Sequence, residues 1–201
     1  MTPLALLFAH GAGAGSMHPW MQAWAQRLGA LGSVTLLDYP YIRAGRRAPD
    51  RLPRLLASHR EALGALRARH PGPVVLVGKS MGARVGCHVS LDDRVDAVVC
   101  LGYPLVGGGK KRAVRDAVLK KMTTPVLFVQ GSRDPMGPLS RFGEVRNEMA
   151  ARSAIHVVDG GNHSLVVGKR ALAAAGEDQA AVDARTLAAI GEFLRGIQVL
   201  R

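Results

Sequence analysis

The chain of 201 residues contains only two cysteines, Cys87 and Cys100. So few cysteines exclude the dense disulfide framework of small secreted domains. The surrounding patterns predict a helix for Cys87 and a buried strand for Cys100. We therefore expect two buried free thiols rather than a bridge or a metal site, and a reducing, cytoplasmic compartment. A chain of this length can bury most of its apolar surface without disulfides, so we expect one domain over residues 1–201.

A long hydrophobic run is missing from the N-terminus. The apolar stretch 4–9 is too short to span a bilayer, and no basic region precedes it. We read it as a strand rather than a signal peptide and expect no membrane span.

Acidic residues are also scarce, since 15 Asp and Glu stand against 27 Lys and Arg, for a formal net charge of +12. Basic residues gather in two clusters, Arg43, Arg46, Arg47, Arg51 and Arg54, and then Lys110, Lys111, Arg112 and Arg115. One hypothesis is that they steer anionic substrates, such as acids joined to phosphate-bearing carriers. The alternative is an ordinary solvated surface. Nucleic-acid binding is disfavoured, because aromatic residues make up 4% of the chain and neither cluster has interleaved aromatics.

Strand and helix patterns alternate along the chain, which predicts an α/β fold with a mostly parallel six-stranded sheet covered on both faces. The expected strands begin near Leu4, Val34, Val74, Val95, Val126 and Ile155. The expected helices cover 19–31, 52–69, 81–91, 111–121, 139–150 and 181–194. The connection from Gly102 to Thr124 is too short for a separate cap domain.

The most specific motif is the pentapeptide Gly78-Lys79-Ser80-Met81-Gly82, which follows the apolar run 73–77. A strand that ends in Gly-x-Ser-x-Gly can form a sharp turn that exposes the serine above the sheet. The two glycines let backbone segments approach where a Cβ would clash. The motif therefore makes Ser80 a candidate nucleophile.

A serine nucleophile needs a histidine to accept its proton and a third group to orient that histidine. Asp134 follows the apolar run 125–130, and His163 follows the predicted strand 155–159. Taken singly, an Asp before Pro is a turn former and a histidine in a glycine loop is solvated. Together, the chain order Ser80, Asp134, His163 after three strands favours a catalytic triad. Asp159 is the alternative acid.

Small residues follow the first predicted strand in His10-Gly11-Ala12-Gly13. Their amide N–H groups could stabilise a developing negative charge, together with the N–H after the nucleophile. We assign the oxyanion hole to the amides of Met81 and Ala12, with Gly13 as the alternative to Ala12. His10 is expected to brace this loop.

Two nucleotide-binding patterns nearly fit. The spacing of Gly11, Gly13 and Gly15 resembles a dinucleotide fingerprint with Asp38 as the ribose ligand, but Ser16 stands where the pattern needs glycine. Gly78-Lys79-Ser80 resembles the end of a phosphate-binding loop, but Pro73 stands where that pattern needs glycine. Neither pattern is satisfied.

These motifs together resemble a small, lid-less α/β-hydrolase similar to the dienelactone-hydrolase-like branch. The resemblance covers nearly the whole chain and is carried by segments 10–15, 78–84, 102–105, 130–137 and 162–164. Dienelactone hydrolases use a cysteine nucleophile where this chain has Ser80, so lactone hydrolysis itself is not implied. The resemblance implies an α/β-hydrolase fold without a cap.

The sequence thus predicts a serine hydrolase that cleaves a small carboxylic ester or thioester through an acyl-enzyme, with no metal or organic cofactor. The rival hypothesis is a non-catalytic interaction or scaffold protein of the same fold. A peptidase or an acyltransferase could use the same residues. Six residues could line the pocket or complete the core: Met17, Trp20, Tyr41, Tyr103, Leu105 and Met136; a core position is favoured for Trp20.

Overall fold

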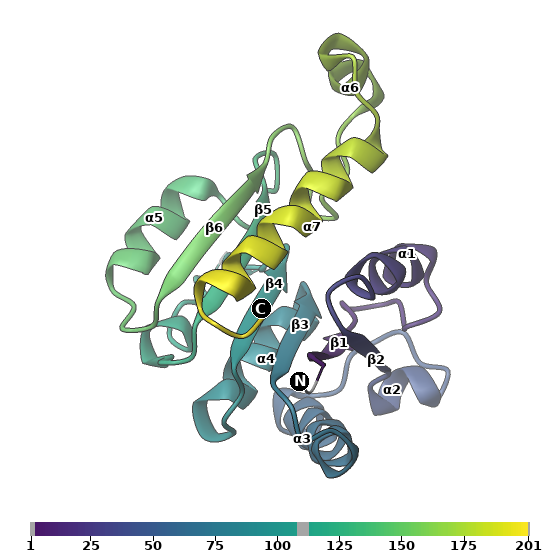
Figure 1. Cartoon of the computed structure of the whole chain (residues 1–201), viewed down its shortest axis with the longest axis vertical. Helices are drawn as coiled ribbons and strands as arrows, with labels where there is room; N and C mark the ends of the chain where they lie inside the picture. The colour runs from purple at the N-terminus through teal and green to yellow at the C-terminus, as the bar shows by residue number, and fades with distance from the viewer. Residues whose placement is uncertain (1–2, 108–112, 201) are drawn as a thin grey trace.

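Six strands form one parallel sheet in the computed structural model, which describes residues 3–107 and 113–200 (Figure 1). They are β1 (Ala5–Ala9), β2 (Ser33–Leu37), β3 (Val74–Lys79), β4 (Ala97–Leu101), β5 (Val126–Gly131) and β6 (Ser153–Val158). The strand order is β2-β1-β3-β4-β5-β6, and every pairing is parallel. The predicted α/β class and the six strands are confirmed.

Side chains of the central strands alternate between two hydrophobic cores, one on each face of the sheet. Leu6 and Phe8 pack with α1 (Pro19–Leu28) and α7 (Gln179–Gly196). Leu7 belongs to the core on the other face. The helices that contribute to that second core are α3 (Leu52–Arg69), α4 (Met81–Asp92) and α5 (Leu139–Asn147). Figure 1 shows α7 crossing one face of the sheet.

The predicted helix over 111–121 is wrong in its described part. Residues 111–112 lie outside the described residues, 113–118 are not helical, and only a 3-10 turn at Leu119–Lys121 follows. The reason is an antiparallel bridge between Val106 and Val114, which pulls this segment back against the chain that follows β4. In this segment, main-chain pairing forms in place of the predicted helix, whose side chains are mostly polar.

Two short helices were not predicted from the sequence. They are α2 (Pro40–Arg43), which begins at a proline, and α6 (Lys169–Ala175), which ends at the left-handed residue Gly176. Figure 1 shows α6 extending beyond the sheet. Neither helix alters the layer order.

The carboxyl ends of all six strands meet at one edge of the sheet, because the strands run in the same direction. Between β4 and β5 the described residues hold only the Val106–Val114 bridge and the 3-10 turn, so no cap domain covers this edge. Within residues 3–107 and 113–200, no helix is long and apolar enough to cross a membrane.

Candidate active site

Ser80 occupies the turn between β3 and α4, with φ 50° and ψ −108°. A positive φ is uncommon for a residue with a side chain and marks backbone strain. A Cβ at Gly78 would overlap the backbone of Ala83, and one at Gly82 would overlap the backbone of Ala9. Both glycines are therefore needed for the close backbone approach that this strained turn requires.

His163 connects Ser80 to Asp134 through its two ring nitrogens. Its Nε2 lies 2.8 Å from Ser80 Oγ, and its Nδ1 lies 2.7 Å from Asp134 Oδ2. Ser80 follows β3, Asp134 follows β5 and His163 follows β6. The structure thus brings the three residues singled out in the sequence into one hydrogen-bonded relay.

The carboxylate of Asp134 is buried and accepts several hydrogen bonds. Burial raises its pKa, but bonds from His163 Nδ1, the Met136 N–H and the Gln130 side chain outweigh this, and its pKa lies below the ordinary value. The sequence analysis missed Gln130, although a polar residue at the end of an apolar strand was a usable signal. Asp159, the alternative acid, instead accepts a hydrogen bond from the hydroxyl of Ser132, 3.0 Å away.

His10 is fully buried and supports the loop that follows β1. Its Nδ1 donates to the Gly11 carbonyl at 2.6 Å, and its Nε2 accepts from the Tyr39 N–H at 3.2 Å. Burial lowers the pKa of His10, so the imidazole is neutral at pH 7. These contacts match the bracing role expected of His10.

The residues expected to form the oxyanion hole come from two segments, the loop after β1 and the first turn of α4. Ala12 is exposed and lines the cleft beside Ser80, whereas Met81 is the first residue of α4. The Tyr41 hydroxyl donates to the Gly11 carbonyl at 3.3 Å and so packs against this loop. Of the two alternatives for the second amide, Ala12 is among the residues that line the cleft and Gly13 is not.

A cleft of about 560 Å³ opens beside Ser80. Its apolar side chains include Trp20, Met21, Met136 and Val166. Of the six residues considered for the pocket, Trp20 and Met136 line it. Tyr41, Tyr103 and Leu105 are buried in the core, and Met17 is 79% exposed. The favoured core position for Trp20 is thus only half right, because this side chain packs against the core and also faces the cleft.

Lys79, inside the Gly78–Gly82 motif, was not singled out in the sequence analysis. It is the last residue of β3, only 8% exposed, and lines the cleft next to Ser80.

The dinucleotide alternative places Asp38 as a ribose ligand. In the structure its two carboxylate oxygens accept from the Ser16 N–H at 2.6 Å and the Ser16 hydroxyl at 2.7 Å. Asp38 therefore closes the loop that follows β1. The phosphate-loop alternative fails as well, because Val74–Lys79 is a strand.

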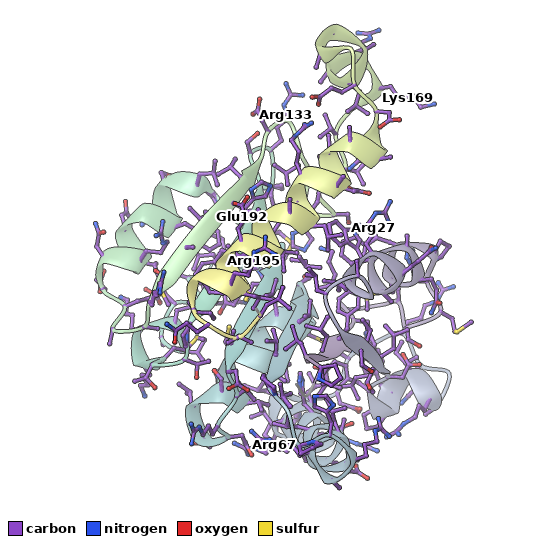
Figure 2. All side chains as sticks on the ribbon, viewed as in Figure 1. Arg27, Arg67, Arg133, Lys169, Glu192 and Arg195 are labelled. Carbon is purple, nitrogen blue, oxygen red and sulfur yellow. The ribbon has the colours of Figure 1, made fainter. Side chains whose placement is uncertain are left out.

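Positive charge is spread widely over the surface. Figure 2 shows Arg27, Arg67, Arg133 and Arg195 on different elements around the sheet. In the first basic cluster, Arg46 and Arg54 lie 2.8 and 3.6 Å from Asp50, which offsets part of the charge there. Lys110, Lys111 and Arg112 of the second cluster lie outside the described residues.

A parallel sheet with a strained serine between β3 and α4, and with an Asp and a His after later strands, defines the class of α/β-hydrolase proteins. A family model described as "Alpha/beta hydrolase domain" matches residues 2–194. The chain belongs to this family.

Solved structures share the fold at low sequence identity. The chain is similar to a dienelactone hydrolase from Anabaena variabilis (18% identity, 100% of this chain and 88% of that chain covered, TM-score 0.73). It is also similar to esterase 2 from Thermogutta terrifontis (19%, 99% and 85%, TM-score 0.73). A serine hydrolase without lid from Xanthomonas campestris matches as well (14%, 97% and 82%, TM-score 0.71). The predicted resemblance to lid-less α/β-hydrolases is confirmed.

Proposed function

We propose that this protein is a serine hydrolase that cleaves a carboxylic ester or thioester through an acyl-enzyme. The observation that carries the proposal is the relay from Asp134 through His163 to Ser80, with contacts of 2.7 and 2.8 Å. Such a relay can convert a weakly nucleophilic hydroxyl into a nucleophile.

In the proposed reaction, Ser80 Oγ attacks the substrate carbonyl while its proton passes to His163 Nε2. Asp134 holds the imidazole in the tautomer with Nδ1–H and stabilises the imidazolium that forms. The amides of Met81 and Ala12 donate to the oxyanion. The proton then goes to the leaving alcohol or thiol, and water, deprotonated by His163, releases the acid and restores Ser80.

The cleft supports a compact, largely apolar acyl or alcohol group, because Trp20, Met21, Met136 and Val166 line it. Its volume of about 560 Å³ lies within the range of small-molecule sites. An anionic substrate remains a hypothesis, supported by the exposed arginines that follow β2 and α2. The buried free thiols of Cys87 and Cys100 support the cytoplasmic location as a further prediction.

A fluorophosphonate probe tests the proposal without assuming a substrate. The esterase 2 of Thermogutta terrifontis was solved phosphoramylated by tabun, which supports an organophosphorus reagent as the first choice. We expect labelling of the wild type at Ser80, mapped by peptide mass spectrometry, and none in Ser80→Ala. Ser140→Ala, an exposed serine of α5, is the matched control and should label normally. A folded wild type that does not react would favour the scaffold hypothesis.

A further inference from the structure

Lys79 is a buried cation one residue before the proposed nucleophile. Burial lowers its pKa to about 8, and the negative charge of Asp134 opposes this shift. A buried ammonium group is costly unless its donors are satisfied. The contacts of Lys79 Nζ therefore identify the groups that compensate for burying this cation.

The Nζ of Lys79 donates to the main-chain oxygen of His163 at 2.6 Å. It also lies 5.6 Å from the ring centroid of Trp20, within the range of a cation–π interaction. The indole Nε1 of Trp20 in turn donates to the main-chain oxygen of Ser164 at 2.9 Å. Two consecutive carbonyls are thus held by donors from β3 and α1, and the two donors also contact each other.

Gly102, which follows β4, makes room for this arrangement. It has φ +68°, and a Cβ added there would lie 2.5 Å from the His163 oxygen and 3.2 Å from Lys79 Nζ. A Cβ at this position would therefore clash with the His163 carbonyl and crowd Lys79 Nζ, so the contact requires glycine here.

The loop that carries His163 is also held from within, by the side chain of Asn162. Asn162 Oδ1 accepts from the N–H groups of Ser164 and Val166 at 2.8 and 3.1 Å. Leu165 between them is held at φ 62°, an uncommon conformation for a side chain of this kind. The loop is thus held in one strained conformation, and Lys79 and Trp20 link its main chain at His163 and Ser164 to β3 and α1.

We propose that Lys79 and Trp20 are positioning residues that clamp the main chain of His163 and Ser164, so that the imidazole stays aligned with Ser80. The proposal rests on the proposed function, since alignment matters only if His163 accepts the Ser80 proton. A misplacement of about 1 Å at a reacting group can cost on the order of 100-fold in rate. Lys79 acts through His163 and is not assigned a proton of its own.

The test compares fluorophosphonate labelling rates at Ser80 in wild type, Lys79→Met and Trp20→Phe. Lys79→Met should label about 100-fold more slowly, and Trp20→Phe, which keeps an aromatic ring but loses the donor, about tenfold more slowly. In the double variant the losses should be less than additive, because both residues hold one loop. Lys79→Arg keeps a cationic donor and should recover part of the loss.

A matched control removes the same group away from the site. Lys121→Met changes an exposed lysine of the 3-10 turn and should label at the wild-type rate. With an ester found by screening, the Lys79→Met loss should fall on kcat while KM changes less than about twofold, as expected for a group that acts in the transition state.

Hydrogen exchange separates the clamp from the hydrolase proposal. Peptides that cover 160–168 should exchange faster in Lys79→Met than in Lys121→Met. If the wild type is labelled and Lys79→Met is labelled at the same rate, the clamp is rejected and the hydrolase proposal stands. If Lys79→Met does not fold, Trp20→Phe decides, and labelling of that variant at the wild-type rate rejects the clamp. If the wild type folds but is not labelled, the hydrolase proposal is rejected. The clamp then has no catalytic role, whatever the hydrogen-exchange rates are.

Discussion

The side-chain amide of Gln130 donates to Asp134 Oδ2, the same oxygen that accepts the bond from His163 Nδ1. Because Asp134 is buried, each donor to its carboxylate favours the ionised form. Gln130 is therefore part of the support of the relay, although it does not touch Ser80 or His163 in the described contacts.

Gln130→Leu should raise the pKa of Asp134 and weaken activity most at low pH. One hydrogen bond to a charged group contributes about 1.5–3 kcal/mol, so we expect a loss of roughly tenfold in the labelling rate at pH 5 and a smaller loss at pH 8. A pH profile of fluorophosphonate labelling measures this. An equal loss at both pH values would contradict the role assigned to Gln130.

Burial of Lys79 should make the stability of the protein rise with pH above pH 8. The pKa is about 8 in the folded state and has a reference value of 10.5, so the unfolded chain binds more protons between these values. The cost of the buried charge is thus present below pH 8 and relieved as pH approaches 10.5. Because other groups titrate there too, the quantity to measure is the unfolding free energy of wild type minus that of Lys79→Met. This difference should increase from pH 8 to pH 10 in urea titrations, and a constant difference would contradict the prediction.

His59 should make the protein less stable as the pH falls from 6.5 towards 4. Burial lowers its pKa to about 4, and its ring nitrogen Nδ1 lies 3.0 Å from the Tyr39 hydroxyl. The unfolded chain binds more protons in this window, so up to roughly 3 kcal/mol is lost on acidification. His59→Phe should flatten part of the slope of unfolding free energy against pH. His10, His88 and His156, whose pKa values are also lowered, contribute to the remaining slope.

Cys87 and Cys100 should be unreactive in the folded protein. Their Sγ atoms lie 3.7 Å apart and both side chains are buried, and burial raises the pKa of the Cys100 thiol. A thiol reagent such as dithionitrobenzoate should titrate neither cysteine in native protein within minutes and both after unfolding in guanidinium. Rapid reaction of the native protein would show that the core around α4 opens readily.

If the basic residues steer an anionic substrate, the labelling or turnover of an anionic ester should slow as salt is added. A neutral ester of the same size is the reference and should show little change. Arg43→Gln with Arg47→Gln, and separately Lys110→Gln with Lys111→Gln, should reduce the salt dependence. The control pair is Arg67→Gln with Arg195→Gln, two exposed arginines elsewhere on the surface (Figure 2). If no pair alters the salt dependence, the steering hypothesis is rejected.

The sequence was sufficient to predict which residues lie close together just after the ends of the strands. Buried parallel strands appear as continuous apolar runs, and their carboxyl ends share one edge, so Ser80, Asp134 and His163 could be placed together from spacing alone. The catalytic roles of these residues and of the oxyanion amides remain predictions. Substrate identity is not encoded in any comparable pattern.

The supporting contacts were beyond sequence reasoning for a physical reason. Lys79 Nζ reaches the His163 carbonyl across 84 positions of the chain, and Trp20 Nε1 reaches the Ser164 carbonyl across 144. Every residue has a main-chain carbonyl, so the residue type does not reveal which carbonyl accepts a side-chain hydrogen bond. The wrong helix at 111–121 has a related cause, because the bridge of Val114 to Val106 is set by how the chain folds back after β4.

The strand order also allows the sheet to form in chain order as the chain leaves the ribosome. β1, β2 and β3 already form one end of the sheet, and from there β4, β5 and β6 add in turn at the same growing edge. Folding from the N-terminus can therefore form the turn at Ser80 long before Asp134 and His163 emerge. If Ser80 is the nucleophile, as proposed, a nascent chain should stay inert until the last strand docks, and reactivity towards an organophosphorus probe should then report that assembly of the sheet has finished.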